Sequence, residues 1–368
     1  PYTVTAEDGS TTQQWSVTVT EAAAPFEVNV NFQDNVVTPP AGYLVDYGKE
    51  FGFASATVGT TDYAYGWKLL AGGTPFDASN EAASNSNGVG RNRLGTSYNT
   101  ATDADKLAGT LVHFQGDNIA GWSGQPRGNE LFWELEVPNG VYEVTLGLGD
   151  ASNSVDSRHS ATVEGYTIIP AFAPTSGETR LGTMIVEVTD GLLTINGLGG
   201  FNSKVTHIEV TESTGTPVSG TLAFSPATVS ESLEAGTSGS FNSDLSGAGA
   251  APIGMIIDDN ETASNDWLTL PGAFALGTLQ FNTDASALVS GDTRANSIIA
   301  TATGFTPAVL EADLTVTETL PPPSPGSFAF IEDFDSYGTG NLGDISGDAW
   351  APEGTNPPIP VAVSYTHL

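Results

Sequence analysis

Cysteine is absent from the 368 residues of the chain. Without thiols the chain has no disulfide, no zinc–thiolate site and no cysteine nucleophile, so its stability must come from apolar cores. Long apolar runs are absent as well, because no stretch approaches the roughly 20 apolar residues that a membrane-spanning helix requires. The sequence therefore excludes cysteine chemistry, and we expect no membrane insertion within it.

Basic residues are scarce: the chain has 10 Lys and Arg against 43 Asp and Glu, which gives a formal net charge of −33. Such a charge repels phosphate backbones and anionic lipid headgroups, so we expect no nucleic-acid partner and no membrane-surface binding. All basic residues except Arg294 lie between positions 49 and 204. The region 49–204 is therefore chemically distinct from the rest of the chain.

Glycine and proline are abundant, with 43 and 22 residues, and this bias is typical of short strands joined by tight turns. Alternating apolar residues over 131–137 and 142–148 flank a Pro-Asn-Gly turn, and those over 184–188 and 193–195 flank an Asp-Gly turn. We interpret each pair as an antiparallel hairpin with one buried face. The sequence predicts an all-β protein made of tandem antiparallel β-sandwiches.

Three strand-like segments, at 15–22, 207–213 and 312–319, contain Thr-Glu near their end and are soon followed by proline. Proline cannot donate to a β-ladder and favours extended linkers, so these points are predicted domain boundaries. The first unit contains a hairpin-type turn at Asp8-Gly9. The predicted units are a tail at 1–23, a jelly-roll sandwich at 25–213, a second sandwich at 217–319, a Pro-rich linker at 320–327, the start of a further domain at 328–362 and a terminal segment at 363–368.

Six segments between Phe26 and Thr211 occur in the order typical of one carbohydrate-binding family. They are VNVNFQD (28–34), AGYLVDYGKEFG (41–52), YAYGWK (63–68), TLVHFQG (110–116), WELEVPNGVYEVTLGLGDA (133–151) and GGFNSKVTHIEV (199–210). In this order the region resembles a malectin-like module of the galactose-binding-like group. The resemblance implies a jelly-roll sandwich that binds a sugar without transforming it.

The flanking units resemble other modules of extracellular proteins. Residues 1–23 resemble the last strands of a bacterial immunoglobulin-like domain, 217–319 resembles a further such domain, and 328–362 resembles the opening of a laminin-G-like jelly roll. Residues 363–368 resemble the translation of a sequencing adapter. These resemblances imply a fragment of a secreted bacterial multidomain protein in an extracellular location, with attachment to the cell surface left open.

Four tyrosines and one tryptophan lie close together in the glycine-rich stretch 43–67, where some rings are expected to stay exposed. Exposed rings bind sugars by laying a face against the C–H face of a pyranose. The resemblance implies that Tyr65, and either Tyr43 or Tyr47, line a sugar pocket, whereas the alternative is that these rings belong to the core or its rim. The predicted carbohydrate-binding residues are Tyr43, Tyr47, Tyr65, Trp67, His113, Phe114, Gln115 and Asn202.

Two arginines, Arg91 and Arg93, precede the acidic residues of the segment 150–156. Arginine donates paired hydrogen bonds either to a carboxylate or to sugar hydroxyls and uronates. We favour a buried brace between the arginines and the acidic segment over a direct contact with the ligand.

Motifs of hydrolases, metalloproteases and nucleotide-binding enzymes are absent from the sequence. The acidic loop 258–266 lacks the spacing of an EF-hand, so we expect no cofactor, with a structural calcium left open. We therefore expect a protein that is not an enzyme and whose partner is a glycan or polysaccharide. Two alternatives remain: the accessory region of a polysaccharide-degrading enzyme whose catalytic domain is missing, and a structural surface adhesin.

Overall fold

The computed structural model describes residues 2–16, 18, 25–79, 89–95, 101–115, 131–258 and 267–318. All of them belong to the first of two units, Pro1–Glu318, and the second unit, Thr319–Leu368, lies outside the described residues. The described part is nearly all β, with one short helix, α1 (Asp103–Gly109), which confirms the predicted fold class. No helix within it has the length and apolar character to cross a membrane. The predictions for 320–327, 328–362 and 363–368 fall outside the described residues.

The N-terminal segment forms a two-stranded antiparallel sheet from β1 (Tyr2–Thr5) and β2 (Thr12–Trp15). Gly9 has a φ of 71°, and the Asp8 carboxylate accepts hydrogen bonds from the backbone amides two and three positions further on, each at 2.8 Å. An Asp-Gly pair suits this turn because glycine adopts positive φ without steric cost. The predicted hairpin at Asp8-Gly9 is confirmed.

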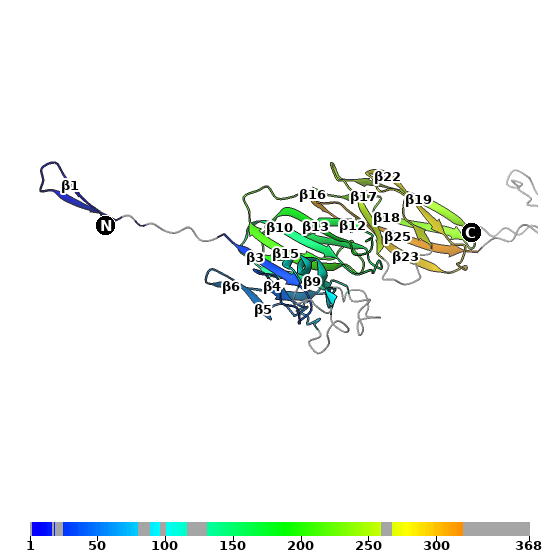
Figure 1. The fold of residues 1–368 in the computed structure, drawn as a ribbon. Helices are drawn as coiled ribbons and strands as arrows, with labels where there is room; N and C mark the ends of the chain where they lie inside the picture. Colours follow the sequence, from blue (N-terminus) through cyan, green and yellow to red (C-terminus); the bar gives the residue numbers. More distant parts are fainter. Residues whose placement is uncertain are drawn as a thin grey trace, which may run out of the picture. The chain divides into compact units, whose positions relative to one another are not determined.

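Two sheets form the first sandwich (Figure 1). One has the order β13-β10-β15-β3-β4, with β8 paired to β15 and β7 paired to β8, and the other has the order β12-β11-β14-β9-β6-β5. The strands of the first sheet are β3 (Glu27–Phe32), β4 (Leu44–Asp46), β7 (Gly90–Asn92), β8 (Thr110–His113), β10 (Gly140–Gly149), β13 (Thr179–Val188) and β15 (Lys204–Glu212). Those of the second are β5 (Ala54–Val58), β6 (Thr61–Leu69), β9 (Leu131–Glu136), β11 (His159–Val163), β12 (Tyr166–Phe172) and β14 (Leu192–Asn196).

The two hairpins predicted in this sandwich are wrong, although all four strands exist. β9 pairs with β6 and β14, whereas β10 pairs with β13 and β15, so the Pro-Asn-Gly turn carries the chain from one sheet to the other. The Asp-Gly turn does the same between β13 and β14. Alternation shows only that a strand buries one face. It does not show whether the next strand along the chain is its hydrogen-bonded neighbour in the same sheet or packs against it from the opposite sheet.

The core between the two sheets is built on large rings. Trp67 and Trp133 each pack against Phe32 in an edge-to-face arrangement, with ring centroids 5.8 and 5.5 Å apart, respectively. The Asp46 carboxylate lies among them and accepts hydrogen bonds from both indole N–H groups, each at 2.8 Å, and from the Gly48 amide at 2.7 Å. The core therefore contains a charged acceptor that is paired to three donors.

The second sandwich has the sheets β17-β19-β22-β21 and β18-β25-β23-β20, and a parallel pair, β16 with β24. The strand β25 covers the segment predicted to bury Leu310, Ala312, Leu314 and Val316, and all four side chains lie in its core. This prediction is confirmed. The strands are β16 (Gly220–Thr221), β17 (Ala223–Ser225), β18 (Thr228–Glu234), β19 (Ser238–Ser246), β20 (Gly254–Asp258), β21 (Leu268–Thr269), β22 (Gly277–Asp284), β23 (Thr293–Thr301), β24 (Phe305–Thr306) and β25 (Ala308–Thr317).

Candidate functional site

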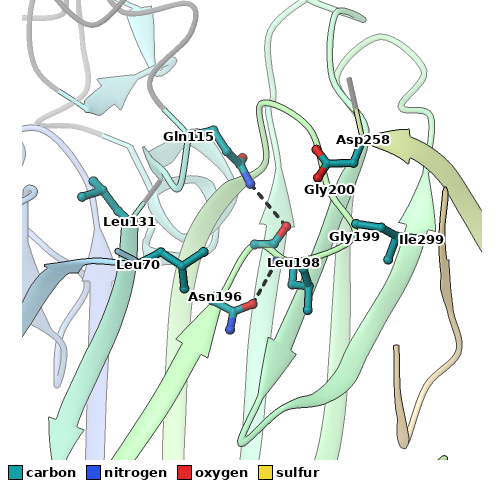
Figure 2. A pocket seen from close by; sticks show the side chains of 10 residues that line it. Leu70, Gln115, Leu131, Asn196, Leu198, Gly199, Gly200, Asp258 and Ile299 are labelled. Carbon is teal, nitrogen blue, oxygen red and sulfur yellow. Dashed lines mark hydrogen bonds between the residues drawn. The ribbon is translucent and has the colours of Figure 1, made fainter. Parts of the chain in front are cut away.

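A pocket of about 120 Å³ opens where strand ends of the first sandwich face the second sandwich (Figure 2). Leu70, Leu131 and Leu198 supply apolar surface, and the amides of Gln115 and Asn196 lie beside them. The opposite wall comes from the second sandwich, through Asp258 at the end of β20 and Ile299 in β23. The pocket therefore combines C–H surface, two amides and one carboxylate.

The two amide side chains are held by the segment that joins β14 to β15 and by β11. Gln115 Nε2 donates to the Gly197 carbonyl at 3.3 Å, and the Ser203 amide donates to Gln115 Oε1 at 2.6 Å. Asn196 Oδ1 accepts from the Leu198 amide at 2.9 Å and from the Thr162 hydroxyl at 2.8 Å. These contacts fix both amide planes before any ligand arrives, which reduces the entropy that binding must overcome.

Three of the predicted site residues, Tyr65, Trp67 and Phe114, lie in the core of the first sandwich, with 4%, 0% and 0% of their surface exposed. The Trp67 and Phe114 rings pack against each other with centroids 5.6 Å apart. β6 alternates its side chains, so positions 65 and 67 share the inward face, where large rings fill the space between the sheets. The expected open aromatic shelf is therefore wrong for these three rings.

The two earlier tyrosines are half-buried, and neither lines the pocket. The Tyr43 hydroxyl donates to the Glu209 carboxylate on β15, and its ring contacts that of His207. The Tyr47 ring lies beside Lys49, whose Nζ is 5.9 Å from the ring centroid. The structure therefore places the two predicted tyrosines, which are four positions apart in the sequence, in different environments.

The polar members of the predicted site fall in one buried cluster. His113 Nδ1 and Asn202 Oδ1 lie 3.0 Å apart, and both side chains are buried. Burial lowers the pKa of His113 well below its usual value, and the positive charge of Lys204 lowers it further, so the ring is neutral. His113 and Asn202 therefore support the segment behind the pocket, and of the eight predicted residues only Gln115 lines it.

The predicted brace is confirmed for Arg93. Its guanidinium donates two hydrogen bonds to the two oxygens of Asp150, at 2.8 and 2.7 Å. Burial alone would raise the pKa of Asp150, but the hydrogen bonds from Arg93 and from the Ser152 amide outweigh it and lower the pKa to about 2. Lys204, which is buried, adds a hydrogen bond from Nζ to the Ser157 hydroxyl at 2.5 Å. Lys204 Nζ also lies 3.9 Å from Asp150 Oδ2, so this structural network links the residue that follows β10 to the start of β15.

Sequence reasoning missed Asn196, Leu198, Asp258 and Ile299. Asn196 carried a weak signal, because it is the first amide after an alternating strand and precedes the glycine pair at 199–200. The sequence places Asp258 in a candidate calcium loop whose other members, 259–266, lie outside the described residues. Within the described part, no group of three or more His, Cys, Asp or Glu side chains could hold a metal ion.

Comparisons with known proteins add little to this geometry. No known protein family matches the chain, and no curated protein is a significant match. One similar solved structure is described as "Native structure of a family 35 carbohydrate binding module from Clostridium thermocellum", with 16% identity, coverage of 28% of this chain and 98% of that chain, and a TM-score of 0.17. Another is a chimeric titin Z1Z2-Z1Z2 tandem, with 15% identity, coverage of 50% and 90%, and a TM-score of 0.19. At these TM-scores neither similarity carries an argument about function.

Proposed function

We propose that the first sandwich binds carbohydrate without breaking a bond, and that the pocket at Gln115 and Asn196 contacts the sugar. The observation that carries this proposal is the pair of pre-positioned amides above a leucine surface. A primary amide donates and accepts hydrogen bonds in one plane, which matches neighbouring hydroxyls on a sugar ring. The leucine side chains offer apolar area to the C–H groups between those hydroxyls.

The size and the polar groups of the pocket favour recognition of a sugar edge. A volume of about 120 Å³ is well below the roughly 300–1,000 Å³ of pockets that enclose a drug-sized ligand, so it suits part of one sugar residue. Glycoside hydrolysis uses a pair of carboxylates across the scissile bond, whereas among the described residues Asp258 is the one carboxylate that lines this pocket. These features support binding over hydrolysis. The resemblance to secreted bacterial modules supports an extracellular location.

Replacing Gln115 or Asn196 by alanine is expected to weaken glycan binding by about tenfold, because each change removes one or two hydrogen bonds to the ligand. Binding of the full chain is first surveyed on a glycan array and then measured by calorimetry for the best ligand. Gln280→Ala is the matched control, because Gln280 is an exposed amide on β22 of the second sandwich.

Each variant is first checked for cooperative unfolding well above the assay temperature, since Gln115 also accepts a backbone hydrogen bond and its loss is expected to lower stability. Unaltered affinity in folded Gln115→Ala and Asn196→Ala proteins would show that the sugar binds elsewhere. If the wild-type chain bound no glycan on the array, the proposed function would be wrong.

A further inference from the structure

The second sandwich contacts the first through hydrogen bonds donated by backbone amides. The Gly304 amide donates to the Thr167 carbonyl at 2.8 Å, and the Ala171 amide donates to the Thr301 hydroxyl at 2.8 Å. Both contacts join β12 of the first sandwich to residues at or after the end of β23. Hydrogen bonds of this kind fix a relative position more tightly than apolar contact alone, because they are directional.

At Gly254 the two backbones approach so closely that a side chain does not fit. A Cβ atom at this position would lie 2.4 Å from the Ala171 carbonyl oxygen and 2.5 Å from the Ala171 nitrogen. Both are backbone atoms, which cannot move aside as a flexible side chain can. Gly254 begins β20, the strand that ends at Asp258 in the wall of the pocket. The contact therefore positions that wall.

A second cavity, of about 460 Å³, lies along the same contact between the sandwiches. The first sandwich lines it with Asp156, Arg158 and the half-buried ring of Phe201, and the second with apolar residues that include Ile257 and Leu270. Arg158 and Phe201 are held together by two backbone hydrogen bonds, of 2.8 and 2.7 Å. This cavity combines an aromatic ring, a guanidinium and a carboxylate, which are groups that bind the C–H face and the hydroxyls of sugars.

The two cavities are neighbours along both walls. Gly200 lines the first and Phe201 lines the second, while on the facing strand Asp258 lines the first and Ile256, two positions earlier on the same face of β20, lines the second. Residues two positions apart on one face of a strand are separated by about 6.4–6.8 Å, so the two cavities open close together on this face. A chain of sugars that enters one cavity would therefore reach the other.

We propose that these cavities are successive subsites of one cleft built by both sandwiches, and that its ligand is an oligosaccharide of at least two residues. The first subsite holds one sugar by Gln115 and Asn196, and the second holds the next over Phe201, with Arg158 on its hydroxyls. The second sandwich is thus part of the binding site, and not only a spacer. This inference rests on the glycan binding proposed above.

The test measures how affinity depends on ligand length in the full chain. Ladders of glucose, xylose and galactose oligomers, from monosaccharide to hexasaccharide, are titrated by calorimetry. The wild type is expected to bind the trisaccharide of the preferred ladder at least about tenfold more tightly than the monosaccharide, because a second ring is stacked and hydrogen-bonded. Phe201→Ala is expected to lose this gain and to keep its monosaccharide affinity.

Two matched pairs separate the cleft from general effects. Phe53→Ala removes a ring that is 55% exposed and lies outside both cavities, so it is expected to leave the length dependence unchanged. Gly254→Ala pushes the sandwiches apart and is expected to weaken binding at both subsites, whereas Gly272→Ala, whose Cβ would meet open space, is expected to bind as wild type. Circular dichroism confirms that each variant is folded.

The outcomes distinguish this inference from the proposed function. Binding that is equal for monosaccharide and trisaccharide, with Phe201→Ala indistinguishable from wild type, would overturn the extended cleft and leave the single pocket in place. Binding that is unaffected in a folded Gly254→Ala protein would overturn the role of the second sandwich. A wild-type chain that binds no ladder would overturn both, and a peptide ligand in the second cavity would become the alternative to test.

Discussion

Asp46→Ala is expected to lower the free energy of unfolding of the first sandwich by at least about 3 kcal/mol, because each of three orphaned buried donors costs at least about 1 kcal/mol. The substitution leaves the indole N–H groups of Trp67 and Trp133 and the Gly48 amide without their acceptor. Burial raises the pKa of Asp46 to about 6, against the opposing effect of these three donors. Denaturant unfolding is therefore measured near pH 8, where the carboxylate is charged.

Two further variants make this prediction sharp. Asp46→Asn keeps one acceptor oxygen but turns an NH₂ group toward a donor, so its loss of stability is expected to be intermediate. Asp62→Ala is the matched control, because Asp62 is exposed and accepts one hydrogen bond, from the Thr57 hydroxyl, so a loss below about 1 kcal/mol is expected. Tryptophan fluorescence follows the transition. Equal midpoints for Asp46→Ala and Asp62→Ala would show that the buried carboxylate does not organise the core.

Acidification from roughly pH 7.5 to 4.5 is expected to lower the free energy of unfolding of the His159→Phe variant by about 2–3 kcal/mol less than that of the wild type. The His159 ring is fully buried, contacts Phe172, and neither ring nitrogen has a hydrogen-bond partner. Burial, and secondarily the positive charge of Lys204, lower its pKa from 6.5 to about 3. Phenylalanine fills a similar volume and does not titrate.

The sign of this effect follows from proton uptake by the two states. Between pH 6.5 and 3 the unfolded chain protonates His159 and the folded chain does not, so the free energy of unfolding falls as the pH falls through this window. Glu164 and Asp46, whose pKa values are raised to about 7 and about 6, act in the opposite direction. Both are present in the wild type and in the variant, so their contribution cancels.

Unfolding curves of both proteins are recorded at the two pH values. The loss in free energy of unfolding on acidification is then compared between the wild type and the variant. The curves near pH 7.5 serve as the internal control for any change in packing, because His159 is neutral in both states there. If the wild type and His159→Phe lose the same stability on acidification, the ring must be protonated or solvated in the folded protein.

The brace at Arg93 shows what local sequence was able to predict about the site. A guanidinium forms strong paired hydrogen bonds with a carboxylate, and this preference does not depend on which strands carry the two groups. The same reasoning failed for Trp67, since aromatic rings serve equally well in a core and on a sugar-binding surface. Burial decides between the two roles, and burial depends on which face of β6 meets the opposite sheet.

Residue type and alternation alone specify the all-β class, the inward face of β25 and the turn at Asp8-Gly9, because propensity, period and turn chemistry act over a few neighbouring positions. Three features arise only when distant strands pack: the crossing of the chain between sheets at the Pro-Asn-Gly turn, the burial of Tyr65 and Trp67, and the placing of Asn196 and Asp258 in one pocket. The sequence of a strand that buries one face does not specify which strand it pairs with. Pairing depends on which arrangement of all strands buries the most apolar surface.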